Sequence, residues 1–474
     1  MKTDTIAAIA TAISDAGIGI IRVSGDEAVS IVHHIYRDKN QKDVLEHYQS
    51  HTIHYGFIIT KSGDIIDEVM ISVMKAPHSY TMEDTVEINC HGGVLMMKKI
   101  LMEVIQAGAR MAEPGEFTKR AFLNGRIDLS RAEAVMDIIH AKNEFALKTS
   151  VQQLKGSVSD KIKTLRDQIL YEIAFIESAL DDPEHISLDG YEKELSEKTG
   201  DIEAELSKLL SSADDGRILK EGIRTVIVGK PNVGKSSLLN LFMGQDRAIV
   251  TDIAGTTRDT LEETIRFGDI TLNIMDTAGI RDTEDAVEKI GVERAKKMSE
   301  EADLILYVID SSEALDENDE IILKLIEGKK TIILLNKSDL MEVTDKNTVK
   351  NFYHKNIDHN GQFTEKDDSI SLLRISAKEK EGLDELKALI EDYFFHGKIV
   401  SEEELYITNV RHKEAILEAL ESIRQVKQSL ENHMPEDFYS IDLMSAYASL
   451  GRILGEEVGE DLVNKIFSEF CMGK

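Results

Sequence analysis

The chain has 474 residues, enough for about three domains of ordinary size. Its net charge of −31 repels polyanions, so any RNA contact needs a local basic patch. No run of 18 apolar residues could span a membrane, and the first residues are unlike a signal peptide. Two cysteines, Cys90 and Cys471, cannot build a disulfide framework. We therefore expect a cytoplasmic protein.

Residues 1–118 are expected to form a small α+β domain. Strand-like segments rich in β-branched residues are found at Gly19–Val23, Thr52–Ile59, Glu68–Val73 and Asp84–Asn89. The segment Val94–Gln106 has apolar residues at helical spacing and ends before Gly108, which favours a helix.

Residues 119–215 are expected to be helical. Ser130 is a candidate N-cap, because Glu133 follows three residues later as in a capping box. Arg131–Leu180 is rich in Ala, Leu and charged residues and contains few helix breakers. A second helix is expected at about 191–213.

The last part of the chain, 385–474, is expected to be helical again. Its long helices are predicted at about 409–433 and 441–470. Between the two helical parts, 216–384 alternates strands and helices. Gly216 and Gly222 mark its entry, and Gly397 lies near its exit. We therefore predict a multidomain α/β plus all-α fold in which an α/β domain is inserted into a helical domain. Separate domains in a row are the alternative.

The most specific motif is Gly229–Ser236, which fits the phosphate-binding pattern G-x-x-x-x-G-K-[ST]. It follows the strand-like Arg224–Val228, and its glycines let backbone N–H groups approach phosphate oxygens. Lys235 would bind the β- and γ-phosphates, and Ser236 would coordinate Mg²⁺. The predicted nucleotide-binding residues of this loop are Asn232, Val233, Gly234, Lys235, Ser236 and Ser237.

Three later motifs, each after a strand-like segment, indicate that the nucleotide is GTP. Asp276 can hold a Mg²⁺-bound water, and the Gly279 N–H can meet the γ-phosphate. Asp339 offers paired acceptors for the N1–H and N2–H₂ donors of guanine, a pair that adenine lacks. A loop beginning at Ser376 would close over the base. The nucleotide-binding residues predicted here are Asp276, Thr277, Ala278, Gly279, Asn336, Lys337, Asp339, Ser376, Ala377 and Lys378.

These motifs are compatible with more than one catalytic group. Ile280 stands where many GTPases place a glutamine that orients the attacking water. Glu288 is a candidate for that role, although an exposed helix charge is the simpler reading of this residue. Thr257 or Thr256 would complete Mg²⁺ coordination. Arg258 is either an internal arginine finger or a partner for a loop carboxylate.

The motifs resemble those of the MnmE (TrmE) family of tRNA-modification GTPases. GTPases that assist ribosome assembly share much of the nucleotide-binding part, so other segments must distinguish the two groups. Pro114–Leu129 and Phe470–Lys474 are similar to signatures of the MnmE family. The resemblance spans nearly the whole chain.

The resemblance implies a Ras-like G domain at 216–384 and a homodimer joined through folate-binding domains at 1–118. The family's folate-contacting positions match Arg22, Glu87, Arg126 and Lys474. It also implies a partner protein of the MnmG (GidA) type that uses FAD and NADH. The two proteins would add a carboxymethylaminomethyl or aminomethyl group to C5 of the wobble uridine of certain tRNAs, with a tetrahydrofolate derivative as the one-carbon donor.

The resemblance further implies GTP hydrolysis that is stimulated by K⁺ when the G domains dimerise. Asn232, Thr251, Ile253 and Thr256 match the positions that hold K⁺ in the family. Glu288 matches the carboxylate that positions water, which favours the catalytic reading of this residue.

Cys471 matches a cysteine of the family's C-terminal motif, where a catalytic or redox role and a buried apolar role are equally compatible with the sequence. Two other functions stay open. One is a switch that docks on ribosomal particles, but the acidic charge and helical C-terminal part argue against a basic RNA-binding appendage. The other is a folate-dependent transferase with a regulatory G domain.

Overall fold

The computed structural model describes residues 4–42, 44–243, 263–267, 270–275, 301–356, 370–395, 405–456, 458–468, 470 and 473. The chain divides into two compact units. The first comprises residues 1–139, 150–203 and 415–474, and the second comprises 140–149 and 204–414. The predicted fold class, multidomain α/β plus all-α, is confirmed by the two sheets and the long helices. Within the described ranges, no helix is both long and apolar enough to cross a membrane.

The N-terminal part of the first unit is built on a seven-stranded sheet of order β3-β4-β5-β6-β2-β1-β7. All its neighbouring strands are antiparallel except the parallel pair β1 and β7. The strands are β1 Ile6–Ile9, β2 Ala16–Ser24, β3 Tyr36–Asp38, β4 Thr52–Ile59, β5 Ile65–Met74, β6 Thr85–Gly92 and β7 Arg110–Met111.

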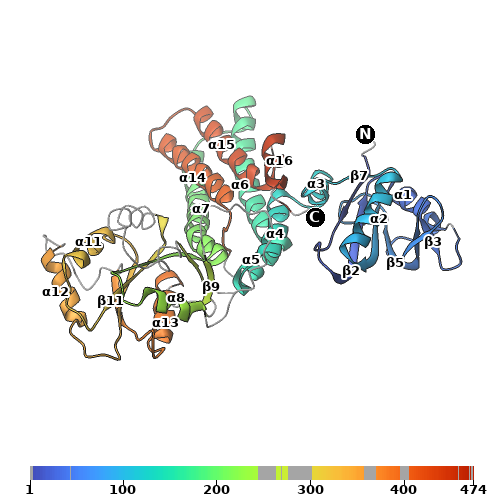
Figure 1. Cartoon of the computed structure of the whole chain (residues 1–474). Coiled ribbons are helices and arrows are strands. Elements are labelled where there is room, and N and C mark those ends of the chain that lie inside the picture. Colours follow the sequence, from blue (N-terminus) through green and yellow to red (C-terminus); the bar gives the residue numbers. More distant parts are fainter. Residues whose placement is uncertain are drawn as a thin grey trace. The chain divides into compact units, whose positions relative to one another are not determined.

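One face of this sheet forms the core of the N-terminal part. Helices α1 (Ala28–Ile35) and α2 (Val94–Gln106) cover it, as Figure 1 shows. Their buried apolar residues pack with those of β2, β5 and β6 in one cluster. The other face leaves apolar side chains exposed on neighbouring strands, with Tyr55 of β4 directly opposite Met70 of β5. Ile53 of β4 is also exposed.

Helices form the rest of the first unit and continue into the second. They are α3 Glu116–Leu123, α4 Leu129–His140, α5 Glu144–Lys155, α6 Ser157–Asp181, α7 Tyr191–Glu221, α14 Val410–Glu431, α15 Glu436–Leu454 and α16 Glu460–Ser468. Helices α6 and α15 lie side by side. The Arg166 guanidinium of α6 lies 4.0 Å from the ring centre of Tyr447 and forms a 2.6 Å ion pair with Glu456.

The helix boundaries differ from the sequence prediction at three places. Ser130 lies inside α4, and the residue that caps this helix is Asp128, whose Oδ1 accepts from the Arg131 N–H at 3.0 Å. The predicted stretch Arg131–Leu180 is three helices, and Gly156 separates the last two with a φ of 110°. Gly216 lies within α7, where a Cβ atom would overlap the Ile407 carbonyl oxygen, so close packing explains this glycine.

The second unit contains a six-stranded sheet of order β13-β12-β11-β8-β10-β9. Its strands are β8 Ile223–Val228, β9 Glu263–Phe267, β10 Ile270–Ile274, β11 Leu304–Asp310, β12 Thr331–Asn336 and β13 Ile370–Arg374. The strands run parallel except for the antiparallel edge pair β9 and β10. Parallel strands bring their carboxyl ends to one edge of the sheet, where ligands bind in such folds.

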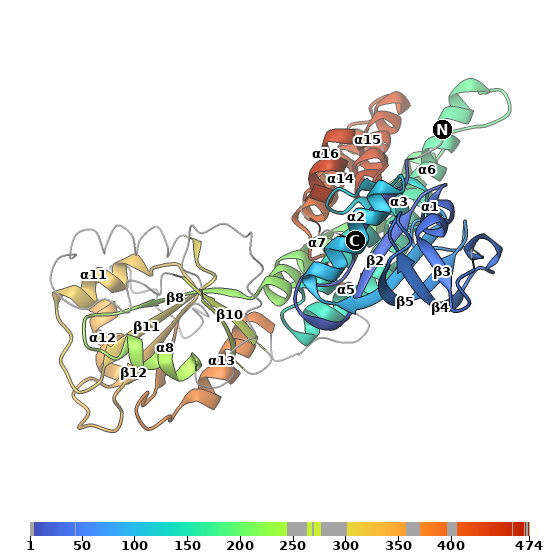
Figure 2. The same ribbon diagram turned by 45° about the vertical axis from the view of Figure 1, so that its right-hand side comes forward.

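Helices cover both faces of this second sheet (Figure 2). Buried residues of α8 (Lys235–Met243) and α13 (Leu383–Phe395) pack in one apolar cluster with one set of strand residues. Buried residues of α11 (Glu317–Leu325) and α12 (Lys346–Asn356) pack in another cluster with the alternate set. The unit is thus a doubly wound α/β domain. Strand β8 lies between β11 and β10, near the middle of the sheet.

Candidate functional site

The loop between β8 and α8 has a backbone that only particular residues allow. Gly229 and Gly234 have φ angles of 151° and 101°, and Asn232 is left-handed at 62°. A Cβ atom at Gly229 would overlap the Val308 carbonyl oxygen, and one at Gly234 would overlap the Asn336 amide. Glycine is therefore required at both ends of this loop by conformation and by space.

Lys235 is held inside the phosphate-binding loop. Its ammonium donates to the carbonyl oxygens of Gly229 at 2.8 Å and of Lys230 at 2.6 Å. Because an ammonium has three N–H donors, one remains for an anionic ligand. Burial lowers the pKa of Lys235, and a bound phosphate would favour the charged form. Ser236 and Ser237 follow on the first turn of α8 and are exposed.

Asn336 connects three loops at the carboxyl edge of the second sheet. The side chain is only 2% exposed. Its Nδ2 donates to the Val233 carbonyl oxygen at 2.7 Å, and its Oδ1 accepts from the Ala377 N–H at 3.0 Å. One amide therefore joins the phosphate-binding loop to the segment that follows β13. The sequence predicted these loops as separate motifs, and the structure adds that one side chain joins them.

Asp339 presents a carboxylate beside that segment. Its Oδ1 accepts from the Ser376 hydroxyl at 2.7 Å, and the Lys378 ammonium lies 4.0 Å from its Oδ2. The hydrogen bond from Ser376 holds the pKa of Asp339 below its usual value. Nearby, the Lys337 ammonium pairs with Asp310 Oδ2 at 2.5 Å and anchors the motif to the end of β11. An ionised carboxylate fixed in this way suits a base that offers two N–H donors.

A second group of charged residues lies on the first sheet. Arg22 of β2 and Glu87 of β6 face each other in the strand register and form a 2.8 Å ion pair. Arg22 also donates to the carbonyl oxygen of Gly473 at 3.1 Å, which brings the C-terminal segment to this sheet. Arg126 lies with its guanidinium carbon 4.8 Å from the ring centre of Tyr80. The structure thus brings together three of the four residues that match folate-contacting positions.

Sequence reasoning did not identify Tyr80, which lies between the two arginines. The guanidinium carbon of Arg22 is 5.4 Å from the ring centre of Tyr80, and Arg126 donates to the Tyr80 carbonyl oxygen at 3.1 Å. The Tyr80 hydroxyl bonds to the Thr118 hydroxyl at 2.9 Å. Two cations, the Glu87 carboxylate and an aromatic face suit a ligand with carboxylates at one end and N–H donors at the other.

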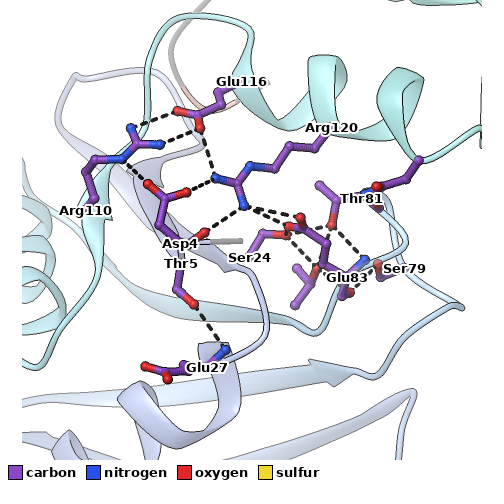
Figure 3. Close-up of polar contacts among 12 residues, drawn as sticks. Asp4, Thr5, Ser24, Glu27, Ser79, Thr81, Glu83, Arg110, Glu116 and Arg120 are labelled. Carbon is purple, nitrogen blue, oxygen red and sulfur yellow. Dashed lines mark hydrogen bonds and ion pairs between the residues drawn. The ribbon is translucent and has the colours of Figure 1, made fainter. Parts of the chain in front are cut away.

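Ion pairs fix the loop that carries Tyr80 (Figure 3). The Arg120 guanidinium, whose side chain is 10% exposed, contacts both carboxylate oxygens of Glu83 at 3.2 Å. It also donates to Glu116 at 3.0 Å and to Asp4 at 2.8 Å. Arg110 donates to the same Glu116 at 2.6 Å. The start of β1, the loop before β6 and α3 are joined through this one arginine.

Several predicted site residues lie outside the described residues, and their positions remain predictions. They are Thr251, Ile253, Thr256, Thr257, Asp276, Thr277, Ala278, Gly279, Glu288, Cys471 and Lys474. Cys90 lies in the core of the first sheet, where burial raises the pKa of its thiol to about 11. This thiol is not a reactive thiolate at neutral pH.

Comparisons with known proteins match nearly the whole chain. A family model of the MnmE helical domain matches residues 129–471, and a model described as the GTP-binding protein TrmE N-terminus matches residues 5–126. A relative from Lachnoclostridium phytofermentans, called tRNA modification GTPase MnmE, is 55% identical over 474 residues and covers 100% of both chains. The chain belongs to the MnmE family.

Two more relatives with the same name support this assignment. The MnmE of Clostridioides difficile is 47% identical over 475 residues, and that of Alkaliphilus oremlandii is 45% identical over 476 residues. In each case the alignment covers 99% of this chain and 99% of the relative. The resemblance to MnmE that the motifs predicted is therefore confirmed.

Proposed function

We propose that this chain is a GTP-hydrolysing enzyme that acts in tRNA modification. Together with an FAD- and NADH-dependent partner of the MnmG type, it would add a carboxymethylaminomethyl or aminomethyl group to C5 of the wobble uridine. The observation that supports this most strongly is the full-length similarity to tRNA modification GTPases. The hydrogen bonds by which Asn336 joins the phosphate-binding loop to the segment after β13 agree with it. A tetrahydrofolate derivative would be the one-carbon donor.

In the G domain, the proposed roles follow the motif positions. The phosphate-binding loop and Lys235 bind the phosphates, and Asp339 binds the guanine edge. The exposed Ser236 hydroxyl on the first turn of α8 suits a Mg²⁺ ligand, with Thr257 as the second ligand from the chain. Glu288 would position the attacking water, because Ile280 has no polar atom for that task.

A potassium ion is part of the same proposal. Asn232, with Thr251, Ile253 and Thr256, would hold it beside the phosphates. The exposed, left-handed Asn232 on the phosphate-binding loop is compatible with that role. When bound, the ion would supply positive charge where negative charge builds up during hydrolysis.

The N-terminal part would bind the folate. Arg22 and Arg126 would bind carboxylates of the glutamate tail, Glu87 would accept from the pterin, and Lys474 would add a further cation. The two guanidinium groups beside the Tyr80 ring, one of them paired with the Glu87 carboxylate, support this assignment. Cys471, in the same C-terminal segment, is proposed as a reactive thiol. Homodimerisation through 1–118 is supported by the exposed apolar face that contains Tyr55 and Met70.

GTP hydrolysis is expected to be faster in KCl than in NaCl at equal ionic strength. We expect a difference of roughly tenfold or more, because a cation that fits beside the developing charge need lower the barrier by only about 1.4 kcal/mol for a tenfold change in rate. The measurement is phosphate release at saturating GTP. The stimulation should disappear in Asn232→Ala, while GDP still binds. Equal rates in the two salts would remove the potassium assignment.

The experiment that tests the proposed function is nucleoside mass spectrometry of bulk tRNA. Cells lacking the protein are compared with cells that express wild type, Asp339→Asn or Arg22→Met. We expect 5-substituted wobble uridines to vanish without the protein and to return only with wild type. If Arg22→Met restores them, the folate assignment is wrong. If they persist without the protein, the tRNA assignment is wrong and ribosome-assembly profiles become the next measurement.

A further inference from the structure

Lys230 lies in the phosphate-binding loop, but its side chain contacts a neighbouring helix. The ammonium pairs with Asp319 Oδ2 at 2.8 Å and with Asp316 Oδ2 at 3.0 Å, both at the start of α11. The Lys230 side chain is 13% exposed and that of Asp319 only 1%. The pair with Asp319 is therefore shielded from solvent, which strengthens it relative to a surface ion pair.

The two aspartates are themselves fixed. They form a capping box, in which Asp316 Oδ1 accepts from the N–H groups of Asn318 and Asp319, and Asp319 Oδ2 accepts from the N–H of Asp316. The remaining oxygen of Asp319 accepts from the hydroxyl of Tyr307 at 2.7 Å. Tyr307 is a fully buried residue of β11. Lys230 thus binds to a rigid acceptor that belongs to both α11 and the sheet.

Lys230 also contacts the phosphate-binding lysine directly. Its carbonyl oxygen accepts from the Lys235 ammonium at 2.6 Å. The same residue therefore bonds through its side chain to α11 and through its backbone to Lys235. If the side chain of Lys230 is released, this carbonyl and the loop backbone lose their fixed position. The ammonium of Lys235 then loses the acceptor that orients it.

We propose that Lys230 is a positioning residue for nucleotide binding, anchoring the phosphate-binding loop to α11 through Asp316 and Asp319. This rests on the proposed GTP binding, and it adds a residue that acts on the phosphates only through Lys235 and the loop backbone. The anchor keeps the loop N–H groups and Lys235 in the arrangement that phosphate oxygens require. Preorganisation of this kind slows the dissociation of a bound nucleotide.

Dissociation of a fluorescent GDP analogue from the full-length chain tests the anchor. Lys230→Met keeps most of the apolar stem and removes the charge. We expect its dissociation rate to rise roughly tenfold, as expected for the loss of charged hydrogen bonds. Lys230→Arg retains a charged donor that can pair with carboxylates, so its dissociation rate should stay closer to wild type than that of Lys230→Met. A wild-type rate in Lys230→Met would overturn the proposal.

Asp316→Asn distinguishes an anchor from a direct contact between Lys230 and the phosphates. Asparagine is a good N-cap, so α11 keeps its capping residue while the charge is lost. An anchor predicts faster dissociation in this variant. If Lys230 instead bound phosphate directly, losing its pair with Asp316 would free it for the nucleotide and GDP would bind more tightly. Tighter GDP binding would therefore contradict the anchor.

Lys324→Met is the matched control. It removes the ammonium of Lys324, which lies in the last turn of α11 with its side chain 55% exposed, and with it the 2.6 Å pair to Glu320. We expect no change in the dissociation rate of Lys324→Met. An increase as large as that of Lys230→Met would show that any loss of positive charge near α11 has this effect, and it would overturn the anchor. Wild-type protein that fails to bind GDP would contradict the proposed GTP binding itself.

Discussion

Replacing Asp339 by asparagine is expected to reverse the base preference of the nucleotide site from guanine to xanthine. Guanine offers an N–H donor at the position where xanthine has a carbonyl oxygen. The new amide donates to that oxygen and still accepts from N1–H, whereas guanine then meets a donor with a donor. A donor–donor mismatch against a bound base changes discrimination by up to about 10⁴-fold. The Ser376 hydroxyl can still donate to the retained oxygen, as it does to Asp339 Oδ1 at 2.7 Å.

The measurement is competition of GTP, XTP and ATP against a fluorescent nucleotide on the full-length chain. Asp345→Asn is the matched control, because the Asp345 carboxylate accepts from the N–H and hydroxyl of Thr348 at the start of α12, outside the loops joined by Asn336. Its preference for GTP should be unchanged. If Asp339→Asn keeps the wild-type order of affinities, the motif that begins at Asn336 does not read the base.

The Arg120→Met variant is expected to destabilise the N-terminal part by about 3–5 kcal/mol. Removing one partner of a buried ion pair leaves the other charge without compensation. Here the change removes the Arg120 guanidinium from Glu83, whose side chain is 7% exposed, whereas Glu116 keeps its ion pair with Arg110 (Figure 3). Glu83 would keep the Ser24 hydroxyl as a neutral donor at 2.9 Å. The loop that carries Tyr80 should loosen as a result.

Hydrogen exchange of the β1 and β6 amides reports this loss locally, so it does not depend on two-state unfolding of the whole chain. Arg110→Met is the control, because Arg110 binds the same Glu116 but is 43% exposed, and it should cost about 1 kcal/mol or less. Glu83→Gln combined with Arg120→Met should recover part of the protection. Equal effects of the two arginine variants would mean that burial of Arg120 does not govern this network.

Features with a local signal could be predicted from the sequence. The helix at Val94–Gln106 has the predicted bounds, because apolar periodicity and the glycine that follows both lie within one segment. Strand β4 likewise matches its predicted bounds at Thr52–Ile59. Strand β1 (Ile6–Ile9) was missed, because two of its four residues are alanine, which has low strand propensity.

Features that depend on distant partners could not be predicted. Tyr80 gives no local signal, since its two arginines lie on β2 and after α3. The anchor of Lys230 joins residues more than eighty positions apart in the chain. Gly156 lies within a stretch that the sequence predicts to be helical, and its left-handed φ, which separates α5 from α6, has no local signal. A single sequence indicates the secondary-structure propensity of each segment, but it does not indicate which distant residues come into contact when the chain folds.

The amide of Asn336 makes the two halves of the nucleotide site thermodynamically dependent on each other. One side of this amide bonds to the Val233 carbonyl of the loop expected to surround phosphate, and the other bonds to the Ala377 N–H, which is expected to lie beside the base. If binding at the phosphate loop changes the free energy of binding at the base, then binding at the base must change the free energy of binding at the phosphate loop by the same amount. Release of the γ-phosphate should therefore alter how strictly the base is recognised. The identity of the base should equally alter how firmly the phosphates are held.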